Sequence, residues 1–334
     1  MLAGKTKGLM MISRAFRTGL LAATLIGASA PLALAQAPYP NQTIKIIVPN
    51  PAGGLPDTLS RIVGKRLQER VGQPVVVENR PGANSGIGTA AMTQAPADGY
   101  TLMMADGAIL SISPLLYAKL PYNPKDVLPV SMVARAPLFL AINPQVPAKN
   151  LKELIDYAKA NPGKLNYGSI GIGSFHHLSM EAFNAAFGLQ MNHIPYKGSS
   201  ETIGAILGGH IDILFAAYAG LRPAAETKKV VIIGSNGPKR SPQAPDVPAI
   251  AELSPGFDLA VIQGITTRIG APRVAVEKIA AEMAEIVKEP ETVAQFSTAG
   301  IEPIGAGPDE YRAALNAEAE RMAKIVEKAG LKAQ

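Results

Sequence analysis

The chain has 334 residues, no cysteine and a formal net charge of +6 at pH 7. The lack of cysteine excludes disulfides and thiolate metal sites, so the fold relies on burial of apolar surface. Four of the basic residues lie in residues 1–35, which hold no acidic residue, and without this segment the formal charge is only +2. Such a charge argues against a nucleic-acid partner.

Residues 1–35 have the pattern of a secretory signal. Basic residues precede an apolar run at residues 20–26, and small residues follow and end in Ala-Leu-Ala. The apolar run is too short to span a bilayer as a mature helix, although an uncleaved anchor is the alternative. We therefore expect cleavage near Ala35 and a soluble protein in the periplasm, whose 299 residues suffice for two lobes.

Strand and helix patterns alternate through most of the remaining chain, which is typical of an α/β fold with mainly parallel sheets. Apolar, β-branched runs predict strands at 44–48, 74–78, 100–105, 165–169, 211–215 and 230–234. Apolar residues at helical spacing predict helices that end near Val71 and Gln94, helices at 151–160 and 201–207, one that begins after Ser174, and three more at 272–288, 290–299 and 308–329.

The chain is expected to cross twice between two lobes. An apolar run at 130–142 is interrupted by Pro137, where we place the first crossing. The turn-rich segment 235–255 leads to a return crossing near Phe257. The predicted first lobe therefore comprises residues 36–137 and 257–334, and the second comprises residues 138–256.

Two glycine-rich loops follow neighbouring predicted strands. In the first, Gly53 and Gly54 stand between a strand and a helix, where they can bring backbone N–H groups close to a bound group. The positive end of the helix dipole points to the same place, which suits a carboxylate or another anion. The second loop, at residues 82–88, is expected beside the first because loops at the carboxyl ends of such strands converge on one rim of the sheet.

The catalytic motifs of common enzyme classes are missing. The four histidines show no metal-binding spacing, and no Gly-x-Ser-x-Gly elbow surrounds Ser169 or Ser174. The glycines of residues 168–173 lack the Lys-Ser/Thr of a phosphate loop and the spacing of a dinucleotide fingerprint. We therefore expect no cofactor, no metal and no catalytic activity.

The chain resembles the Bug family of periplasmic solute-binding proteins, the extracytoplasmic receptors of tripartite tricarboxylate transporters. Each matching stretch is weak alone, but together they span nearly the whole predicted mature chain in the family's order. They are VPNPAGGLPDTLSR at 48–61, VVENRPGANSGIG at 76–88, ADGYTL at 97–102, NPGKLNYG at 161–168, GSFHHL at 173–178, IPYKG at 194–198 and PDVP at 245–248.

The resemblance implies a two-lobed periplasmic-binding-protein fold of the type II-like kind, which closes on a small organic acid. It also implies delivery of that acid to the membrane subunits of a transporter. Two stretches depart from the family pattern: Val261 to Gln263, where a tryptophan is usual, and residues 226–232. These departures leave the identity of the acid open among citrate-like, C4-dicarboxylate, amino-acid and aromatic carboxylates.

The resemblance also nominates ligand-binding residues by position. In the family, amides of the two glycine-rich loops hold the ligand carboxylate nearest the first lobe, often with ordered waters. The candidates here are Ala52, Gly53, Gly54 and Asp57 in the first loop, Asn84, Ser85, Gly86 and Ile87 in the second, and Ser174, His177 and Tyr196 for the far end of the ligand.

Several of these candidates have a purely structural alternative. The two glycines of the first loop can simply form a tight turn, and Asp57 can be a helix-start residue or can orient its loop. Ser174 fits the position of a helix N-cap, and His177 and Tyr196 can be packing residues.

Two other functions use the same cleft. An exported hydrolase of small esters would need Ser174 as nucleophile and His177 as base, the only local pair, and no third member is evident. A sensory receptor would pass the signal of the bound ligand to a membrane kinase instead of a transporter.

Overall fold

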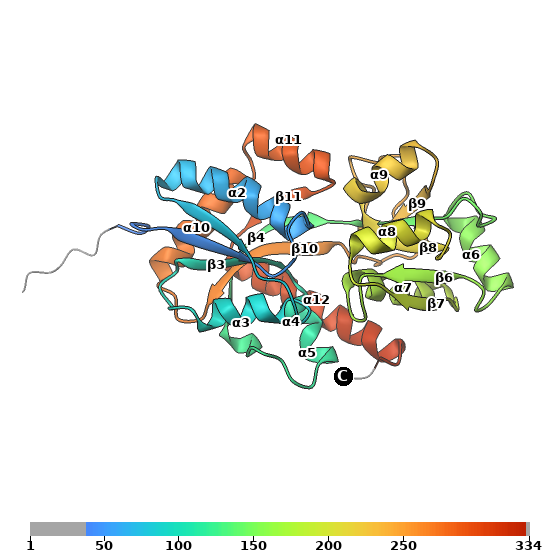
Figure 1. The fold of residues 1–334 in the computed structure, drawn as a ribbon, viewed down its shortest axis with the longest axis horizontal. Coiled ribbons are helices and arrows are strands. Elements are labelled where there is room, and N and C mark those ends of the chain that lie inside the picture. Colours follow the sequence, from blue (N-terminus) through green and yellow to red (C-terminus); the bar gives the residue numbers. More distant parts are fainter. Residues whose placement is uncertain (1–37, 332–334) are drawn as a thin grey trace, which may run out of the picture. The chain divides into compact units, whose positions relative to one another are not determined.

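The computed structural model describes residues 38–331, and Figure 1 shows their fold. The predicted signal segment lies outside the described residues. Within them, eleven strands form two sheets, and eleven α-helices pack against the sheets. No helix of this part of the chain is long and apolar enough to cross a membrane.

The first sheet has six strands in the order β11-β4-β10-β3-β1-β2. Strand β1 pairs in parallel with β2 and β3, whereas β10 pairs antiparallel with β3 and β4, and β11 antiparallel with β4. The bounds are β1 Ile44–Val48, β2 Val75–Asn79, β3 Thr101–Asp106, β4 Val127–Ala136, β10 Val261–Arg268 and β11 Glu302–Ala306.

The second sheet has five strands in the order β7-β6-β8-β5-β9. Strand β6 pairs in parallel with β7 and β8, and β5 pairs antiparallel with β8 and β9. The bounds are β5 Leu138–Ile142, β6 Asn166–Ser169, β7 Asn192–Pro195, β8 Ile213–Ala217 and β9 Val231–Ser235.

Both sheets are mixed, so the prediction of mainly parallel sheets is wrong. Each sheet has a parallel group of three strands, which the alternation of strands and helices predicts. The antiparallel pairs come from β4, β5, β9, β10 and β11, which lie at or near the passages between the sheets, or follow them. An apolar run indicates a buried strand but not its direction, which depends on the side from which the chain enters the sheet.

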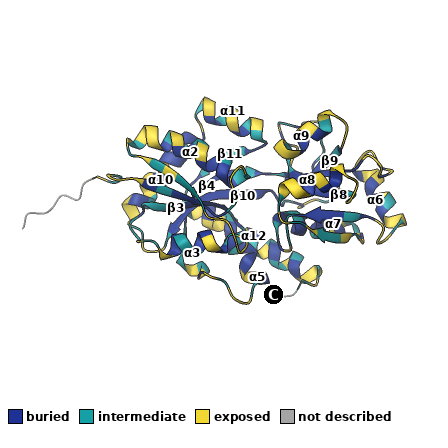
Figure 2. Cartoon of the chain, in the orientation of Figure 1, coloured by how far each residue is buried: buried dark blue, intermediate teal, exposed yellow. Residues whose placement is uncertain are grey.

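Helices cover both faces of each sheet. In the first sheet, α2, α10 and α11 lie on one face and α3, α4 and α12 on the other (Figure 1). Figure 2 shows their buried residues turned to the strands. The bounds are α2 Leu55–Val71, α3 Gly86–Gln94, α4 Ala108–Ser111, α5 Ser113–Leu116, α10 Arg273–Ile286, α11 Pro290–Ala299 and α12 Pro308–Lys328.

Alternating residues of β5 separate the two faces of the second sheet. Leu138, Leu140 and Ile142 pack with helices α6 (Leu151–Ala160) and α7 (Phe175–Phe187). Phe139 and Ala141 pack with helices α8 (Ser199–Leu207) and α9 (Tyr218–Glu226). Along α7, the helical spacing of apolar residues predicts an inward face of Phe175, Leu178, Ala182, Phe183 and Ala186, of which all but the exposed Ala186 are buried.

The chain passes from the first sheet to the second at Pro137, between β4 and β5, and returns between β9 and β10. One hydrophobic cluster around the second sheet also includes Ile112 and Leu116, which follow β3, and Met322 and Val326 of α12. The boundaries of the two lobes therefore stay a prediction. These four residues belong to the predicted first lobe, but they pack in the hydrophobic cluster of the second sheet.

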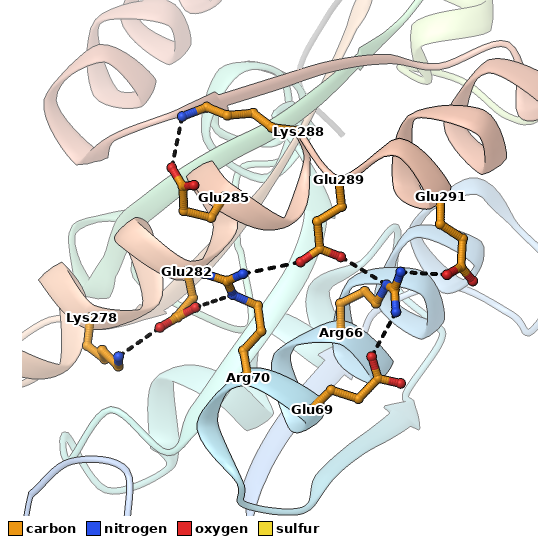
Figure 3. Close-up of polar contacts among 9 residues, drawn as sticks. All are labelled: Arg66, Glu69, Arg70, Lys278, Glu282, Glu285, Lys288, Glu289 and Glu291. Atoms are coloured by element: carbon orange, nitrogen blue, oxygen red, sulfur yellow. Dashed lines mark hydrogen bonds and ion pairs between the residues drawn. The ribbon is translucent and has the colours of Figure 1, made fainter.

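A network of ion pairs fixes α2 against α10 and α11 (Figure 3). Arg66 lies 3.0 Å from Glu289 and 2.5 Å from Glu291, and Arg70 lies 2.5 Å from Glu282. Glu282 is largely buried, so its ion pairs are not merely surface contacts. Burial alone would raise the pKa of Glu282, but hydrogen bonds from Lys278 and Arg70 lower it. The network holds the helix that begins at the first glycine-rich loop.

Candidate functional site

The two glycine-rich loops lie side by side, as the sequence predicts. Strands β1 and β2 end in register, and the backbone N–H of Arg80 donates to Val48 O at 2.8 Å. A Cβ atom at Gly88 would lie 2.7 Å from Pro49 Cβ and 3.0 Å from Arg80 O. Only glycine therefore allows the first turn of α3 to pack directly on the first loop.

The second loop has a strained backbone. Four successive residues have positive φ angles: Gly82 at 124°, Ala83 at 48°, Asn84 at 47° and Ser85 at 70°. Three of them carry a Cβ atom, and each such residue costs on the order of 1–3 kcal/mol. Strain of this kind persists only where the surrounding structure imposes it, and it is typical of binding sites.

The strained loop also leaves polar groups available. Ser85 occupies the N-cap position of α3, but its side chain caps no backbone N–H. The side chains of Asn84 and Ser85, and the backbone N–H groups of both residues, have no hydrogen-bond partner within the described part of the chain. Successive N–H groups in such a turn form a concave anion-binding nest.

Four amides that the sequence analysis assigned to a ligand are instead used within the loops. Gly53 N donates to Asp57 Oδ2 at 2.9 Å, and Gly86 N to Ala83 O at 2.9 Å. The bonds of Gly54 N to Pro51 O and of Ile87 N to Gly82 O are longer, at 3.4 and 3.3 Å. Tight turns pair their own N–H groups, which the sequence does not reveal. Among the described residues, the backbone N–H of Ala52 has no such partner.

Asp57 is only 3% exposed and orients the first loop. Besides Gly53 N, its carboxylate accepts hydrogen bonds from Arg61 Nε and Nη2 at 3.1 and 2.9 Å, and from Asn79 Nδ2 at 3.0 Å. Burial alone would raise the pKa of Asp57, but the hydrogen bonds of Arg61, Gly53 and Asn79 together lower it. The carboxylate is thus ionised and fully occupied.

Ser174 is the N-cap of α7, which agrees with its structural interpretation. Its hydroxyl accepts a hydrogen bond from His177 N at 3.3 Å and donates to Gly171 O at 2.8 Å. Gly171 and Gly173 have φ angles of 122° and 77°, which only glycine adopts readily. The hydroxyl of Ser174 therefore closes the loop between β6 and α7.

His177 is buried within the lobe, and its ring stabilises the same loop. Its Nδ1 accepts from Gly173 N at 3.1 Å, and its ring stacks on that of His193 at 4.0 Å between centroids. His193 Nε2 lies 2.7 Å from Ser169 Oγ. Burial, followed by the neighbouring His193, lowers the pKa of His177 to about 4. Burial also lowers the pKa of His193 to about 4, so both rings are neutral at pH 7.

Tyr196 differs from these two residues. Its backbone N–H bonds to Ser169 O at 2.9 Å, and its half-buried ring packs on the hydrophobic cluster that includes Phe139. Its hydroxyl has no partner within residues 38–331. Of the three candidates for the far end of the ligand, Ser174 has its hydroxyl bonded within the loop, whereas the hydroxyl of Tyr196 and the Nε2 of His177 have no hydrogen-bond partner among the described residues.

The arrangement does not fit a hydrolase. The Ser174 hydroxyl donates to a carbonyl, and the Nδ1 of His177 is occupied by a backbone N–H, so these side chains form no nucleophile–base pair. No group of three or more metal-binding side chains occurs among the described residues. The geometry provides hydrogen-bond donors and neutral polar groups, which suit binding.

A family model described as the tripartite tricarboxylate transporter family receptor matches residues 59–331. The chain belongs to this receptor family. It is 34% identical over 307 residues to the protein BugT of Bordetella pertussis, with 88% of this chain and 91% of that protein covered. The proposed resemblance to Bug proteins is therefore confirmed.

Solved structures of receptors have the same fold. An R. palustris protein solved with adipate has 29% identity and a TM-score of 0.82, and covers 89% of this chain and all of its own. The periplasmic binding protein BugD has 28% identity and a TM-score of 0.78, and the match covers 89% of this chain and 100% of BugD. MatC from Rhodopseudomonas palustris, with bound malate, has 25% identity and a TM-score of 0.75, and covers 86% of this chain and all of its own.

These likenesses establish the class of protein. The fold is that of a periplasmic solute-binding receptor, and receptors of this family are not enzymes. The hydrolase alternative built on Ser174 and His177 is therefore not favoured, and the kinase-linked alternative gains no support. The cleavage near Ala35 lies outside the described residues.

Sequence reasoning missed two residues of the site, Arg61 and Asn79. Both act through Asp57, and although they lie within the stretches 48–61 and 76–88, neither was nominated as a site residue. Asn79 ends β2 and reaches the first loop only because β1 and β2 are paired in parallel. A polar residue at the end of a strand next to a glycine-rich loop was the available signal.

Proposed function

We propose that the protein is a periplasmic receptor that captures a small dicarboxylate between its two lobes and delivers it to the membrane subunits of a tripartite transporter. The observation that supports this proposal best is the strained turn at Gly82 to Ser85. It precedes a helix, and it presents beside the first loop N–H and side-chain donors that have no partner among residues 38–331.

The electrostatics of this turn favour a carboxylate. Helix α3 has no acidic residue in its first turn, so the partial positive charge of its N-terminus is not neutralised by the chain. Hydrogen bonds from N–H and O–H groups to a carboxylate are charge-assisted and stronger than neutral ones. We assign one carboxylate of the ligand to Asn84 and Ser85, with the amide of Ala52 nearby.

The second carboxylate is assigned to the other lobe, where Tyr196 offers its hydroxyl. A ligand with an acidic group at each end contacts both lobes and so favours the closed state. The adipate and malate in the two R. palustris structures support the dicarboxylate class. Ser174 and His177 then contribute by holding the loop between β6 and α7.

The test is binding of adipate and malate, with butyrate as the monocarboxylate control. We expect both dicarboxylates to raise the unfolding temperature and to bind in calorimetry, because a ligand of the native state stabilises it. Butyrate should bind much more weakly. If neither dicarboxylate, nor citrate, changes the unfolding temperature at millimolar concentration, the proposed function is wrong.

Two matched variants locate the site. Ser85→Gly removes a hydroxyl while it permits the positive φ angle, and it should weaken adipate binding about tenfold, which corresponds to one charge-assisted hydrogen bond. Ala83→Gly relieves similar strain without removing a donor, so its affinity should stay within about twofold of the wild type. Equal affinities of both variants would remove the second loop from the site.

Delivery needs a separate test. Uptake of labelled adipate into vesicles that hold the membrane subunits should require the receptor and saturate with its concentration. Uptake at the same rate without the receptor would contradict the delivery step but not the binding.

A further inference from the structure

The first loop holds an internal carboxylate where a ligand donor was expected. Asp57 Oδ2 lies 2.9 Å from Gly53 N and 3.1 Å from Arg61 Nε, and Asp57 Oδ1 lies 2.9 Å from Arg61 Nη2. Gly53 has a φ angle of 82°, and no atom lies within 4 Å of the place where its Cβ would stand. No side chain packs at the position of a Gly53 Cβ, and the N–H of Gly53 is held by its hydrogen bond to Asp57.

Asn79 connects this carboxylate to the start of the loop. Its Nδ2 donates to Asp57 Oδ1 at 3.0 Å and to Asn50 O at 3.2 Å, and its Oδ1 accepts from Arg61 Nη2 at 3.3 Å. One amide side chain thus bonds to the loop, to the first turn of α2 and to the guanidinium.

We propose that Arg61 and Asn79 are positioning residues of the binding site, which hold Asp57 on the Gly53 amide and so fix the first loop before a ligand arrives. This inference rests on the proposed function for its effect on affinity. Its effect on the loop itself does not depend on any ligand.

The physical reason is preorganisation. A loop already fixed in its bound conformation loses less conformational freedom when the ligand binds, and affinity rises accordingly. Asp57 must be ionised for this role, and Arg61 is the charged group that keeps it so. The side chain of Arg61 is 57% exposed, so its removal leaves no cavity in the core.

The first experiment follows the Gly53 amide proton by NMR in the protein without ligand. In the wild type its resonance should stay constant between pH 7 and pH 5, because Asp57 remains ionised. In Arg61→Met it should titrate in this range, since the pKa of Asp57 rises when its ion pair is lost. Arg61→Lys should restore much of the wild-type behaviour.

The second experiment measures adipate affinity. We expect Arg61→Met and Asn79→Leu each to lose about tenfold or more, as expected for the loss of hydrogen bonds to a charged group. For Arg61→Met, the ratio to wild-type affinity should fall further from pH 7 to pH 5. The matched control is Arg273→Met, which breaks an exposed i,i+4 ion pair with Glu277 on α10 and should bind normally.

The outcomes separate the two proposals. If the wild type binds no dicarboxylate, the proposed function fails, yet the Gly53 resonance still decides whether Arg61 and Asn79 fix the loop. If Gly53 responds to neither variant, or if adipate affinity is unchanged while Gly53 responds, the positioning role is overturned. A loss of affinity that is independent of pH and is not rescued by lysine would indicate a general loss of structure.

Discussion

The two lobes build their binding loops in opposite ways. In the first lobe, the loop before α3 is strained and leaves the donors of Asn84 and Ser85 unpartnered. In the second, the loop before α7 is closed by the side chains of Ser174 and His177, which bond to its own backbone. Under the proposed function, we therefore expect the first lobe to supply more of the ligand donors than the second, where Ser174 and the Nδ1 of His177 bond to their own loop.

The largest expected effect concerns the histidines of the second lobe. His176, His177 and His193 have pKa values lowered from 6.5 to about 4, mainly by burial. The unfolded chain takes up protons below pH 6.5, and the folded state does so only near pH 4. The contribution of these histidines to stability is therefore complete above pH 6.5 and should be lost as the pH drops towards 4, which thermal unfolding at several pH values will measure.

Histidine variants can show which residue causes this loss of stability at low pH. His177→Gln should flatten the pH dependence, whereas His210→Gln should not, because His210 is exposed. The buried Glu318 acts in the opposite sense: burial raises its pKa from 4.5 to about 8, so its contribution to stability is lost progressively as the pH rises from 4.5 through about 8. An unchanged slope in His177→Gln would show that another group dominates.

The next effect concerns the contact between the two loops of the first lobe. Gly88→Val would place atoms against Pro49 and Arg80 O, so we expect a loss of about 1–3 kcal/mol in stability and a strong loss of adipate binding. Gly204→Ala in α8 is the matched control, since its Cβ meets no atom within 4 Å. Denaturant unfolding and calorimetry test both, and normal binding by Gly88→Val would contradict the close packing of the loops.

A smaller effect is expected for the cap of α7. Ser174→Ala should destabilise the protein by about 1 kcal/mol, the usual cost of a lost N-cap. Its effect on adipate affinity should be less than that of Ser85→Gly, because the Ser174 hydroxyl is occupied within its loop. The reverse order of affinities would show that the second lobe supplies the main donors.

The smallest effect is a gain in stability. Ala83→Gly removes a left-handed residue with a side chain, and should raise the free energy of unfolding by up to about 1 kcal/mol, partly offset by greater freedom of the unfolded chain. The same change at Ala185, an exposed position in the helix α7, should instead destabilise by about 1 kcal/mol. Denaturant unfolding of both variants will measure the difference.

Local patterns in the sequence determined the elements that depend on neighbouring residues. Helices α6 and α11 have their predicted bounds, α3 ends at the predicted Gln94, and Ser174 is the cap that its position suggested. The short helices α4 and α5, helix α9, which contains Pro223, and strands β4, β5, β10 and β11 were not predicted. Their patterns are short or irregular, and contacts with distant strands decide them.

The sequence by itself determined the family, the receptor class and the place of the two glycine-rich loops, because these follow from residue types in a fixed order. Only the tertiary structure decided which polar groups remain available. The bonds of Gly53 to Asp57 and of Gly173 to His177 join residues only four positions apart, but Asn79 and His193, which complete the two arrangements, come from other strands. Hydrogen bonds between distant residues leave no periodic signal in the chain.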